Sequence, residues 1–351
     1  MKIAVAMSGG LDSSVAAALL KNEGHEVFGL TMLVVPTDEA MNNHVPTVAQ
    51  QVAQVLGIPH HVIDLRDIFA ERIISEFCAQ YSLGRTPNPC VRCNRFIKVG
   101  ILYERARELG ADVLATGHYA QIERRESDGR YLLKKGIDRQ RDQSYFLHTL
   151  TQEQLSRTLF PLGTLTKVKV REIATEIKLP VASAESREIC FIPDNDYIRF
   201  LQRHVTSGAG SGVIKDMHGN VLGEHRGIIN YTIGQRRRLG VTAAKPLYVV
   251  AIDSQSNTVV VGGREHIFNT EFMVSGVNWI VMPELVEPLS VRVKIRYLHP
   301  EAEAVVMPET KDRVRVKFKE PQMAITPGQA AVFYNGDVVV GGGTIEEVVR
   351  S

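Results

Sequence analysis

The stretch AVAMSGGLDSSVAAALL, residues 4–20, joins two apolar runs through two glycines, an aspartate and two serines. The run before the glycines is typical of a buried parallel strand, and the run after them has the composition of a helix. Glycine lets the backbone approach an anion closely, and the amides at a helix N-terminus favour negative charge. The stretch therefore predicts a phosphate site between a strand and a helix.

This loop differs from the two commonest phosphate-binding motifs. The chain contains no G-x-x-x-x-G-K-[ST], and Gly9-Gly10 lacks the third glycine of a dinucleotide fingerprint. Asp12 is unusual beside a phosphate, because two negative charges repel each other unless Mg²⁺ lies between them. The loop suits a leaving pyrophosphate. The alternative is a plain helix cap in a tight turn, where aspartate and serine are also favoured.

Strand-like and helix-like segments alternate over the first half of the chain. The expected strands are 2–7, 27–35, 60–65 and 111–118, and the expected helices are 13–23, 48–57 and 97–110. Such alternation predicts βαβ units and a parallel sheet covered by helices, with ligands bound at the carboxyl ends of the strands. We expect an α/β, Rossmann-like nucleotide-binding domain over residues 1–200.

Short β-rich segments replace this pattern after about residue 200. SGAGSG, residues 207–212, is typical of a linker or turn, and clean alternation in VRVKIRY (291–297) and VRVKF (314–318) predicts a small β-barrel or sandwich. We expect a small β-rich central domain over 201–268 and a C-terminal β-barrel over 269–351. Trp279 is expected in the core of this last domain.

Basic residues recur on one face of a strand of the expected barrel. Arg313, Arg315, Lys317 and Lys319 alternate with Val314, Val316 and Phe318. One interpretation is an ordinary solvated face, and the other is a ridge that binds a phosphate backbone. The pattern alone leaves both open.

Composition and cysteine usage limit the class of protein. A net charge of +2 gives no bulk basicity, and no apolar run approaches the ~20 residues that span a bilayer. We expect a cytoplasmic protein without a membrane partner. In a reducing compartment, a C-x-x-C pair such as Cys90 and Cys93 indicates metal or redox chemistry more often than a disulfide. Cys78, on an apolar helix-like stretch, is expected to be a packed core residue.

Longer motifs carry a resemblance to a known family. SGGLDSS resembles the PP-loop of ATP pyrophosphatases, which cleave ATP between the α- and β-phosphates and adenylylate a substrate oxygen. Seven further segments look like the successive blocks of the bacterial tRNA-specific 2-thiouridylases. They are GRTPNPCVRCNRFIK (84–98), ATGHYA (115–120), RDQSYFL (141–147), FPLGTLTK (160–167), ESREICFIP (185–193), GEHRGIINYTIGQRRRLG (223–240) and ITPGQAAVFYNGDVVVGGG (325–343). The resemblance spans nearly the whole chain, in order.

The resemblance implies an ATP- and Mg²⁺-dependent tRNA-uridine 2-sulfurtransferase. The family adenylylates the C2 oxygen of the wobble uridine (U34) of tRNA and then transfers sulfur to give 2-thiouridine, releasing AMP and pyrophosphate. The sulfur would come from a donor protein or from sulfide. The alternatives are a PP-loop ligase that acts on a small molecule and an RNA-binding module with an inactive nucleotide fold.

Carried over position by position, the resemblance implies the binding residues. The ATP phosphates would meet the segment Ala6, Met7, Ser8, Gly9, Gly10, Leu11, Asp12 and Ser13, with Met32 and Gly117 bordering the nucleotide. The target base would meet Asn88, Pro89 and Cys90. The remaining tRNA contacts would be His118, Arg141, Asp142, Gln143, Arg296, Tyr297 and Gln329.

The resemblance also implies catalytic roles. Cys93 takes the position of the nucleophile, Cys190 that of the cysteine that carries a persulfide, and Asp12 acts in the ATP-dependent step. Cys90 stands where the family more often has aspartate, so the chain presents three thiols. Cys90, Cys93 and Cys190 could ligate three irons of a [4Fe–4S] cluster. A persulfide route through Cys93 and Cys190 alone, and a zinc site that needs a fourth ligand, remain open. The prolines and asparagines around Cys90 and Cys93 indicate a loop.

Overall fold

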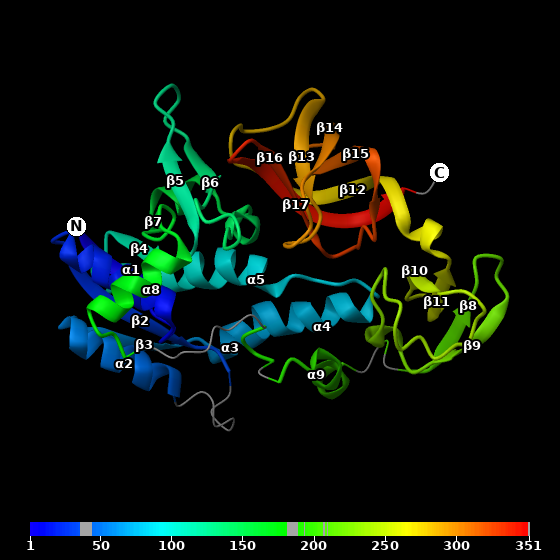
Figure 1. The fold of residues 1–351 in the computed structure, drawn as a ribbon, viewed down its shortest axis with the longest axis horizontal. Coiled ribbons are helices and arrows are strands. Elements are labelled where there is room, and N and C mark those ends of the chain that lie inside the picture. The colour runs from blue at the N-terminus through cyan, green and yellow to red at the C-terminus, as the bar shows by residue number, and fades with distance from the viewer. Residues whose placement is uncertain (36–43, 181–188, 193, 206–207, 209, 350–351) are drawn as a thin grey trace. The chain divides into compact units, whose positions relative to one another are not determined.

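The computed structural model describes residues 1–35, 44–180, 189–192, 194–205, 208 and 210–349 (Figure 1). It divides into two compact units. The first comprises Met1–Ile73, Cys90–Phe191 and Gly336–Val339, and the second comprises Ile74–Pro89, Ile192–Asn335 and Val340–Ser351. None of the described helices combines the length and apolar character that crossing a bilayer requires.

A five-stranded parallel sheet forms the centre of the first unit. Its strand order is β3-β2-β1-β4-β7. The strands are β1 (Lys2–Ala6), β2 (Glu26–Leu33), β3 (His60–Asp64), β4 (Val113–Thr116) and β7 (Thr158–Leu159). Strand β1 pairs with β2 on one side and β4 on the other, so the order reverses at β1 and the loop after β1 lies at the switch point. The predicted α/β fold is confirmed.

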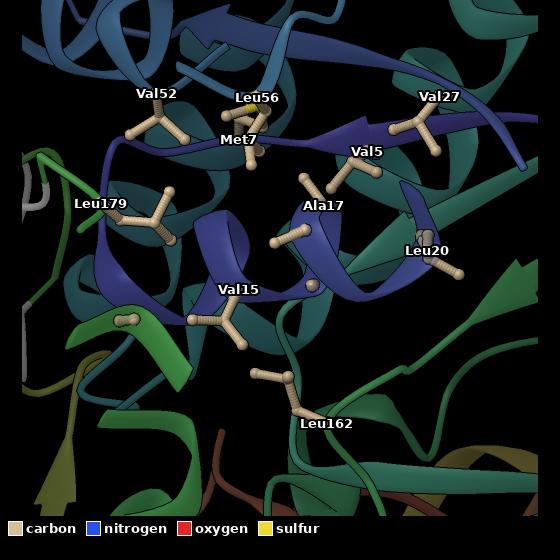
Figure 2. Close-up of a cluster of buried hydrophobic side chains, with 14 of the residues drawn as sticks. Val5, Met7, Val15, Ala17, Leu20, Val27, Val52, Leu56, Leu162 and Leu179 are labelled. Atoms are coloured by element: carbon tan, nitrogen blue, oxygen red, sulfur yellow. The ribbon is translucent and has the colours of Figure 1, made fainter. Parts of the chain in front are cut away.

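Helices cover both faces of this sheet. Alternate residues of β1 point to opposite sides and pack against different helices. Ile3, Val5 and Met7 are buried against α1 (Leu11–Asn22), α2 (His44–Leu56) and α8 (Lys167–Glu176), whereas Ala4 packs with residues of α6 (Tyr103–Glu108). Figure 2 shows Val15, Ala17 and Leu20 of α1 within the first cluster. Burying each valine or leucine side chain contributes about 1.5–3 kcal/mol to the free energy of folding. This packing holds the start of α1 in place.

One continuous helical segment carries Cys90 and Cys93. It consists of α5 (Pro89–Arg92), the π-helix η2 (Cys93–Leu102) and α6. The expectation of a loop here is wrong, because Pro89 occupies the first helical position, where its missing N–H costs nothing. The Nε2 amide of Gln154 donates to the carbonyls of Arg95 (2.7 Å) and Val99 (3.4 Å), two acceptors within the π-helix.

The remaining elements of the first unit lie outside this five-stranded sheet. They are α3 (Arg66–Phe69), η1 (Ala70–Ile74, whose last residue belongs to the second unit), β5 (Ala120–Arg124), β6 (Tyr131–Lys135), η3 (Ser144–Leu147) and α7 (Gln152–Ser156). Strands β5 and β6 form an antiparallel hairpin, in which Ala120 lies opposite Lys135.

Besides the barrel, the described part of the second unit contains two α-helices and a small sheet. The helices are α4 (Ser75–Ser82) and α9 (Tyr197–His204), with short 3₁₀ turns η4 (Ile228–Asn230) and η5 (Arg264–Ile267). The sheet has the order β10-β11-β8-β9, formed by β8 (Gly212–Lys215), β9 (Val221–His225), β10 (Tyr248–Asp253) and β11 (Thr258–Gly262). Of the predicted linker 207–212, residues 207 and 209 lie outside the described residues.

Six strands close into a β-barrel in the order β12-β15-β14-β13-β16-β17, because β17 also pairs with β12. They are β12 (Phe268–Trp279), β13 (Leu289–Lys294), β14 (Ala302–Thr310), β15 (Arg313–Met323), β16 (Ala330–Asn335) and β17 (Val338–Val349). The predicted barrel is confirmed, and Trp279 is buried in its core. The domain boundaries after residues 200 and 268 stay predictions.

The basic face of β15 is a row of ion pairs. Arg315 contacts Glu271 and Glu309, and Arg313 contacts Glu346 and Glu347. Lys317 and Lys319 pair with Glu271 and Glu303. The structure therefore favours the solvated face over a ridge of unpaired cations.

Candidate active site

The loop after β1 is shaped by its own serines. Gly9 has a φ of 72°, in the left-handed region that favours glycine, and Gly10 is the extended residue before α1. The Ser13 hydroxyl accepts from the Ser8 amide (3.2 Å) and donates to the Gly10 carbonyl (3.2 Å), to which the buried Ser14 hydroxyl also donates (2.9 Å). These bonds close the loop on itself without a ligand.

The amino end of α1 has no side-chain cap in the described part of the chain. Its first amides are therefore not taken by a serine or aspartate side chain, which argues against the plain helix cap. Amides at such a position form the usual binding site for an anion.

Gly117 lies directly against this loop. A Cβ atom at Gly117 would lie 2.7 Å from the amide nitrogen of Ser13 and 2.8 Å from the carbonyl carbon of Asp12. Any side chain would push the end of β4 away from α1. The predicted nucleotide residues Ala6, Met32 and Gly117 thus stand at the carboxyl ends of β1, β2 and β4, at one edge of the sheet. Their contacts with a nucleotide stay predictions.

Two of the predicted nucleotide residues also belong to the core. The Met7 side chain is buried, and the Thr31 hydroxyl donates to the Met7 carbonyl (2.8 Å). Leu11 packs against the same core from the first turn of α1. Their side chains hold the loop, so any contact with phosphate would come from their backbone.

Asp12 is held by two residues that the sequence interpretation did not single out. The Lys167 ammonium contacts both carboxylate oxygens at 2.8 Å, and the Tyr119 hydroxyl donates to Oδ1 at 2.7 Å. The Lys167 side chain is 7% exposed and that of Asp12 is 33% exposed. Burial and the bond to Asp12 raise the pKa of Tyr119. FPLGTLTK ends on Lys167, but no local signal links it to a residue 155 positions away.

The three cysteines predicted to act in catalysis share one electrostatic neighbourhood. Cys93 is buried, whereas Cys90 and Cys190 each keep some solvent-exposed surface although protein surrounds them on most sides; all three are free thiols. Burial raises the pKa of Cys93 to about 12 and that of Cys190 to about 11; the neighbouring cysteines add to both shifts, and the Lys98 ammonium opposes them. The pKa of Cys90 is also raised by burial. All three thiols are therefore protonated at neutral pH.

A metal site needs donor atoms of a suitable kind that converge on one point. Thiolates are the ligands that iron–sulfur clusters prefer, so the donor set fits a cluster chemically. Among the described residues, however, no three His, Cys, Asp or Glu side chains converge as metal ligands. Cys78 is buried in α4, as expected of a core residue, and burial raises its pKa. The thiols as they stand do not form a preassembled cluster or zinc site.

His118 is buried and has polar and aromatic neighbours. Its Nδ1 lies 2.7 Å from the Thr116 hydroxyl, and its ring packs edge-on against Phe160. Burial, together with the Lys98 ammonium, holds the pKa of His118 well below its usual range, so the ring is neutral. Its predicted tRNA contact stays a prediction.

Within the segment 141–143, Gln143 bonds directly to Tyr119. The Gln143 side-chain oxygen accepts from the Tyr119 amide (3.0 Å), and Arg141 lies close enough to lower the pKa of the Tyr119 hydroxyl. Asp142 is buried and accepts from the amide (3.1 Å) and hydroxyl (2.9 Å) of Ser144. Gln143 thus braces the residue that contacts Asp12, Arg141 acts on the same hydroxyl through its charge, and Asp142 holds Ser144 instead.

In the second unit, Gln329 holds the segment that leads to Asn88 and Pro89. Its Nε2 amide donates to the Thr86 carbonyl (2.8 Å), and the Thr86 amide donates to the Pro327 carbonyl (2.9 Å). Asn88 is half-buried and Pro89 is buried. Gln329 therefore has a structural role in addition to the tRNA contact predicted for it.

Arg296 and Tyr297 follow β13. The Arg296 guanidinium donates to the Met323 carbonyl (3.1 Å), and the Lys294 ammonium lies 5.9 Å from the centre of the Tyr297 ring. Both side chains are half-buried. Of the ESREICFIP segment, residues 185–188 and 193 lie outside the described residues.

Three protein-family models match successive parts of the chain. Residues 1–194 match the tRNA methyl transferase HUP domain, residues 198–263 the tRNA methyl transferase PRC-barrel domain, and residues 269–345 the aminomethyltransferase beta-barrel domain.

Curated relatives are similar over their whole length. The chain is 52% identical to tRNA-specific 2-thiouridylase MnmA 1 of Caldanaerobacter subterraneus, covering 99% of each chain. It is 51% identical to the tRNA-specific 2-thiouridylase MnmA of Syntrophotalea carbinolica, covering 98% of each. A solved structure of the U34-tRNA thiolase NcsA from Methanococcus maripaludis aligns at 19% identity and a TM-score of 0.37, covering 58% of this chain and 67% of that one, which is too weak to carry an argument.

Proposed function

We propose, because the chain belongs to the family of tRNA-specific 2-thiouridylases, that it uses ATP to replace the C2 oxygen of the wobble uridine of tRNA with sulfur. The products would be 2-thiouridine in tRNA, AMP and pyrophosphate. The cytoplasmic location and the source of sulfur, a donor protein or sulfide, are parts of this proposal.

One structural observation supports the proposal independently of the family to which the chain belongs. The unit that contains the uncapped SGGLDSS loop also contains three mutually interacting thiols, Cys90, Cys93 and Cys190. A ligase that joins nitrogen to a small molecule has no use for the thiols, and an inactive RNA-binding module has no use for the loop. A sulfurtransferase uses both.

The first step would depend on the loop. The amides at the start of α1 would bind the phosphates of ATP, and the helix N-terminus would favour the negative charge of the leaving pyrophosphate. Mg²⁺ is typically held by one or two carboxylates together with substrate phosphates. Asp12 would supply that carboxylate, and the ion would neutralise phosphate charge. The residues at this edge of the sheet then need only hold the α-phosphate near the uridine oxygen.

The second step would depend on the thiols. In the persulfide route, the outer sulfur on Cys190 attacks C2, and AMP leaves with the former C2 oxygen. The Cys93 thiolate then attacks the inner sulfur of Cys190, which breaks the sulfur–sulfur bond to the uridine and leaves a Cys93–Cys190 disulfide for later reduction. Because the pKa of Cys93 is about 12, this thiol must lose its proton during the reaction.

The test is thiolation of an unmodified tRNA transcript by anaerobically purified protein. The assay contains ATP, Mg²⁺, sulfide and a persulfide donor, because sulfide alone cannot form a persulfide on Cys190 without an oxidant. 2-Thiouridine is measured by nucleoside analysis before and after iron is removed. Product that disappears with iron supports a cluster ligated by Cys90, Cys93 and Cys190. Product that survives supports the persulfide route. If neither sample makes 2-thiouridine, the proposed function is wrong.

A single variant separates the two enzymatic classes from the RNA-binding module. Asp12→Ala should abolish the ATP-dependent product of a thiolase or a small-molecule ligase, since each needs the first step. The same variant would leave the RNA affinity of a plain binding module unchanged. The ligase differs from the thiolase in that its product contains no sulfur.

A further inference from the structure

Asp12 carries a negative charge at the place where the proposed function needs an anion to bind. It stands in the first turn of α1, two residues after Gly10, and the backbone of Gly117 lies directly against its own backbone. An uncompensated carboxylate there would repel the phosphates of ATP. The structure supplies a compensating charge in Lys167.

The Lys167 ammonium is fixed by its surroundings. Lys167 is the first residue of α8, after Thr166, whose hydroxyl accepts from the Lys169 amide (3.3 Å). Its own amide donates to Asp138 Oδ2 at 2.9 Å. The side chain then runs through the protein interior with 7% of its surface exposed and ends 2.8 Å from both Asp12 oxygens.

Tyr119 completes the arrangement. Its hydroxyl donates to Asp12 Oδ1 (2.7 Å), and its ring centre lies 5.9 Å from the Lys167 ammonium. The carboxylate therefore receives a charged donor and a neutral donor from two different segments of the chain. A pair of opposite charges, held this way, adds no net charge to the loop.

We propose that Lys167 is a positioning residue for ATP: it acts through Asp12, by cancelling the charge of that carboxylate so that the loop accepts the phosphates before Mg²⁺ arrives. The inference rests on the proposed function, because it takes ATP as the ligand. It makes ATP affinity depend on Lys167 only while the residue at position 12 is charged, and most strongly where Mg²⁺ is scarce.

The experiment is a double-mutant cycle on ATP binding with Lys167→Met, Asp12→Asn and the double variant. Calorimetry measures the ATP affinity of each protein at low and at high Mg²⁺. At low Mg²⁺, Lys167→Met should weaken binding about 10-fold or more, a size typical of coupling between charged neighbours. High Mg²⁺ should restore most of the affinity. In the Asp12→Asn background, the same substitution should change affinity by less than about threefold.

Two controls separate this role from others. Lys169→Met removes an exposed lysine of the same helix, paired with Glu172, and should leave ATP affinity unchanged. Lys167→Arg keeps the charge and should recover much of the affinity. Both variants also control for folding, because each changes a lysine of α8 and should bind ATP. The double variant removes the charges of Lys167 and Asp12 together.

The outcomes distinguish failure of this inference from failure of the proposed function. If wild-type protein binds ATP and Lys167→Met binds it equally well, the inference is wrong and the proposed function stands. If Lys167→Met costs the same affinity in the wild-type and the Asp12→Asn backgrounds, the inference is also overturned, because Lys167 would then contact the phosphates directly. If wild-type protein does not bind ATP at high Mg²⁺, the proposed function itself fails.

Discussion

The nucleotide domain and the barrel use ion pairs in opposite ways. Lys167 and Asp12 form a pair in which the lysine side chain is 7% exposed. On β15, Arg315 lies between Glu271 and Glu309 with 38% of its side chain exposed. Water screens the second arrangement, whereas in the first it reaches the Asp12 carboxylate but hardly reaches the Lys167 side chain. A row of charges that is conspicuous in the sequence is thus an ordinary surface, whereas one inconspicuous lysine is closely tied to the site.

The largest expected effect concerns the thiols of the nucleotide domain. Cys190→Ser should lower 2-thiouridine formation by a factor of about 1,000 or more, as the loss of a nucleophilic group does, and ATP affinity should stay the same. Cys90→Ser is the matched comparison: a cluster needs this thiol, and the persulfide route does not. Normal thiolation by Cys190→Ser would refute the catalytic assignment.

The next largest effect is on stability and depends on the different burial of Lys167 and Asp12. Urea denaturation measures it as a change in the free energy of unfolding. Asp12→Asn leaves the Lys167 ammonium buried without a counter-charge and should lower the free energy of unfolding by about 3 kcal/mol. Lys167→Met leaves a carboxylate that is one-third exposed, so its cost should be only about 1–2 kcal/mol. The double variant should be more stable than Asp12→Asn. The opposite ranking of the two single variants would contradict this account.

A third expectation follows from the raised pKa values of Cys93 and Cys190. Thiolate is the reactive form, and its fraction rises about tenfold per pH unit below the pKa. In iron-free protein, alkylation of Cys190 by iodoacetamide should therefore rise about tenfold per unit from pH 7 to 9. Peptide mapping distinguishes it from Cys90. A plateau below pH 9 would mean that the pKa is not raised to about 11.

A smaller effect is expected within the second unit. Gln329→Ala removes the bond to the Thr86 carbonyl and should lower the free energy of unfolding by about 1 kcal/mol. Gln322→Ala, which loses only a bond to the nearby Glu320 carbonyl, is the control. If Gln329→Ala reduces tRNA affinity without any change in stability, the contact with Thr86 is not what matters.

The smallest effect tests the barrel side of the comparison. Arg315→Ala should change stability by less than about 1 kcal/mol, as exposed ion pairs do, and should leave thiolation unchanged within about twofold. A large loss of tRNA affinity that depends on salt would reinstate β15 as a phosphate-binding face.

Local patterns were sufficient to predict the architecture. Apolar runs and helical spacing identified β1, β2, β3 and β4 and the helices between them, because buried strands and amphipathic helices differ in period. Alternation in β13 and β15 predicted the barrel. The loop SGGLDSS was placed correctly at the carboxyl end of β1, since glycines and serines between a strand and a helix have few other uses.

Contacts distant in sequence could not be predicted in this way. Nothing in FPLGTLTK shows that Lys167 meets Asp12, and nothing around Tyr119 shows its hydroxyl bond to the same carboxylate. The helix that begins at Pro89 escapes prediction because proline usually ends a helix, although it is also favoured at the first helical position. The pairing of Arg315 with Glu271 depends on strand register, which composition does not contain.

The π-helix after Cys93 limits how this part of the chain can change in length. Each residue of an α-helix turns the chain by about 100°, and η2 accommodates more residues per turn than that. Deleting one residue between Cys93 and Tyr103 would allow an ordinary α-helix, but it would also rotate the cysteine relative to the buried face of α6. The Gln154 amide would lose its pair of acceptors at the same time. In this segment the number of residues, as well as their identity, is under constraint.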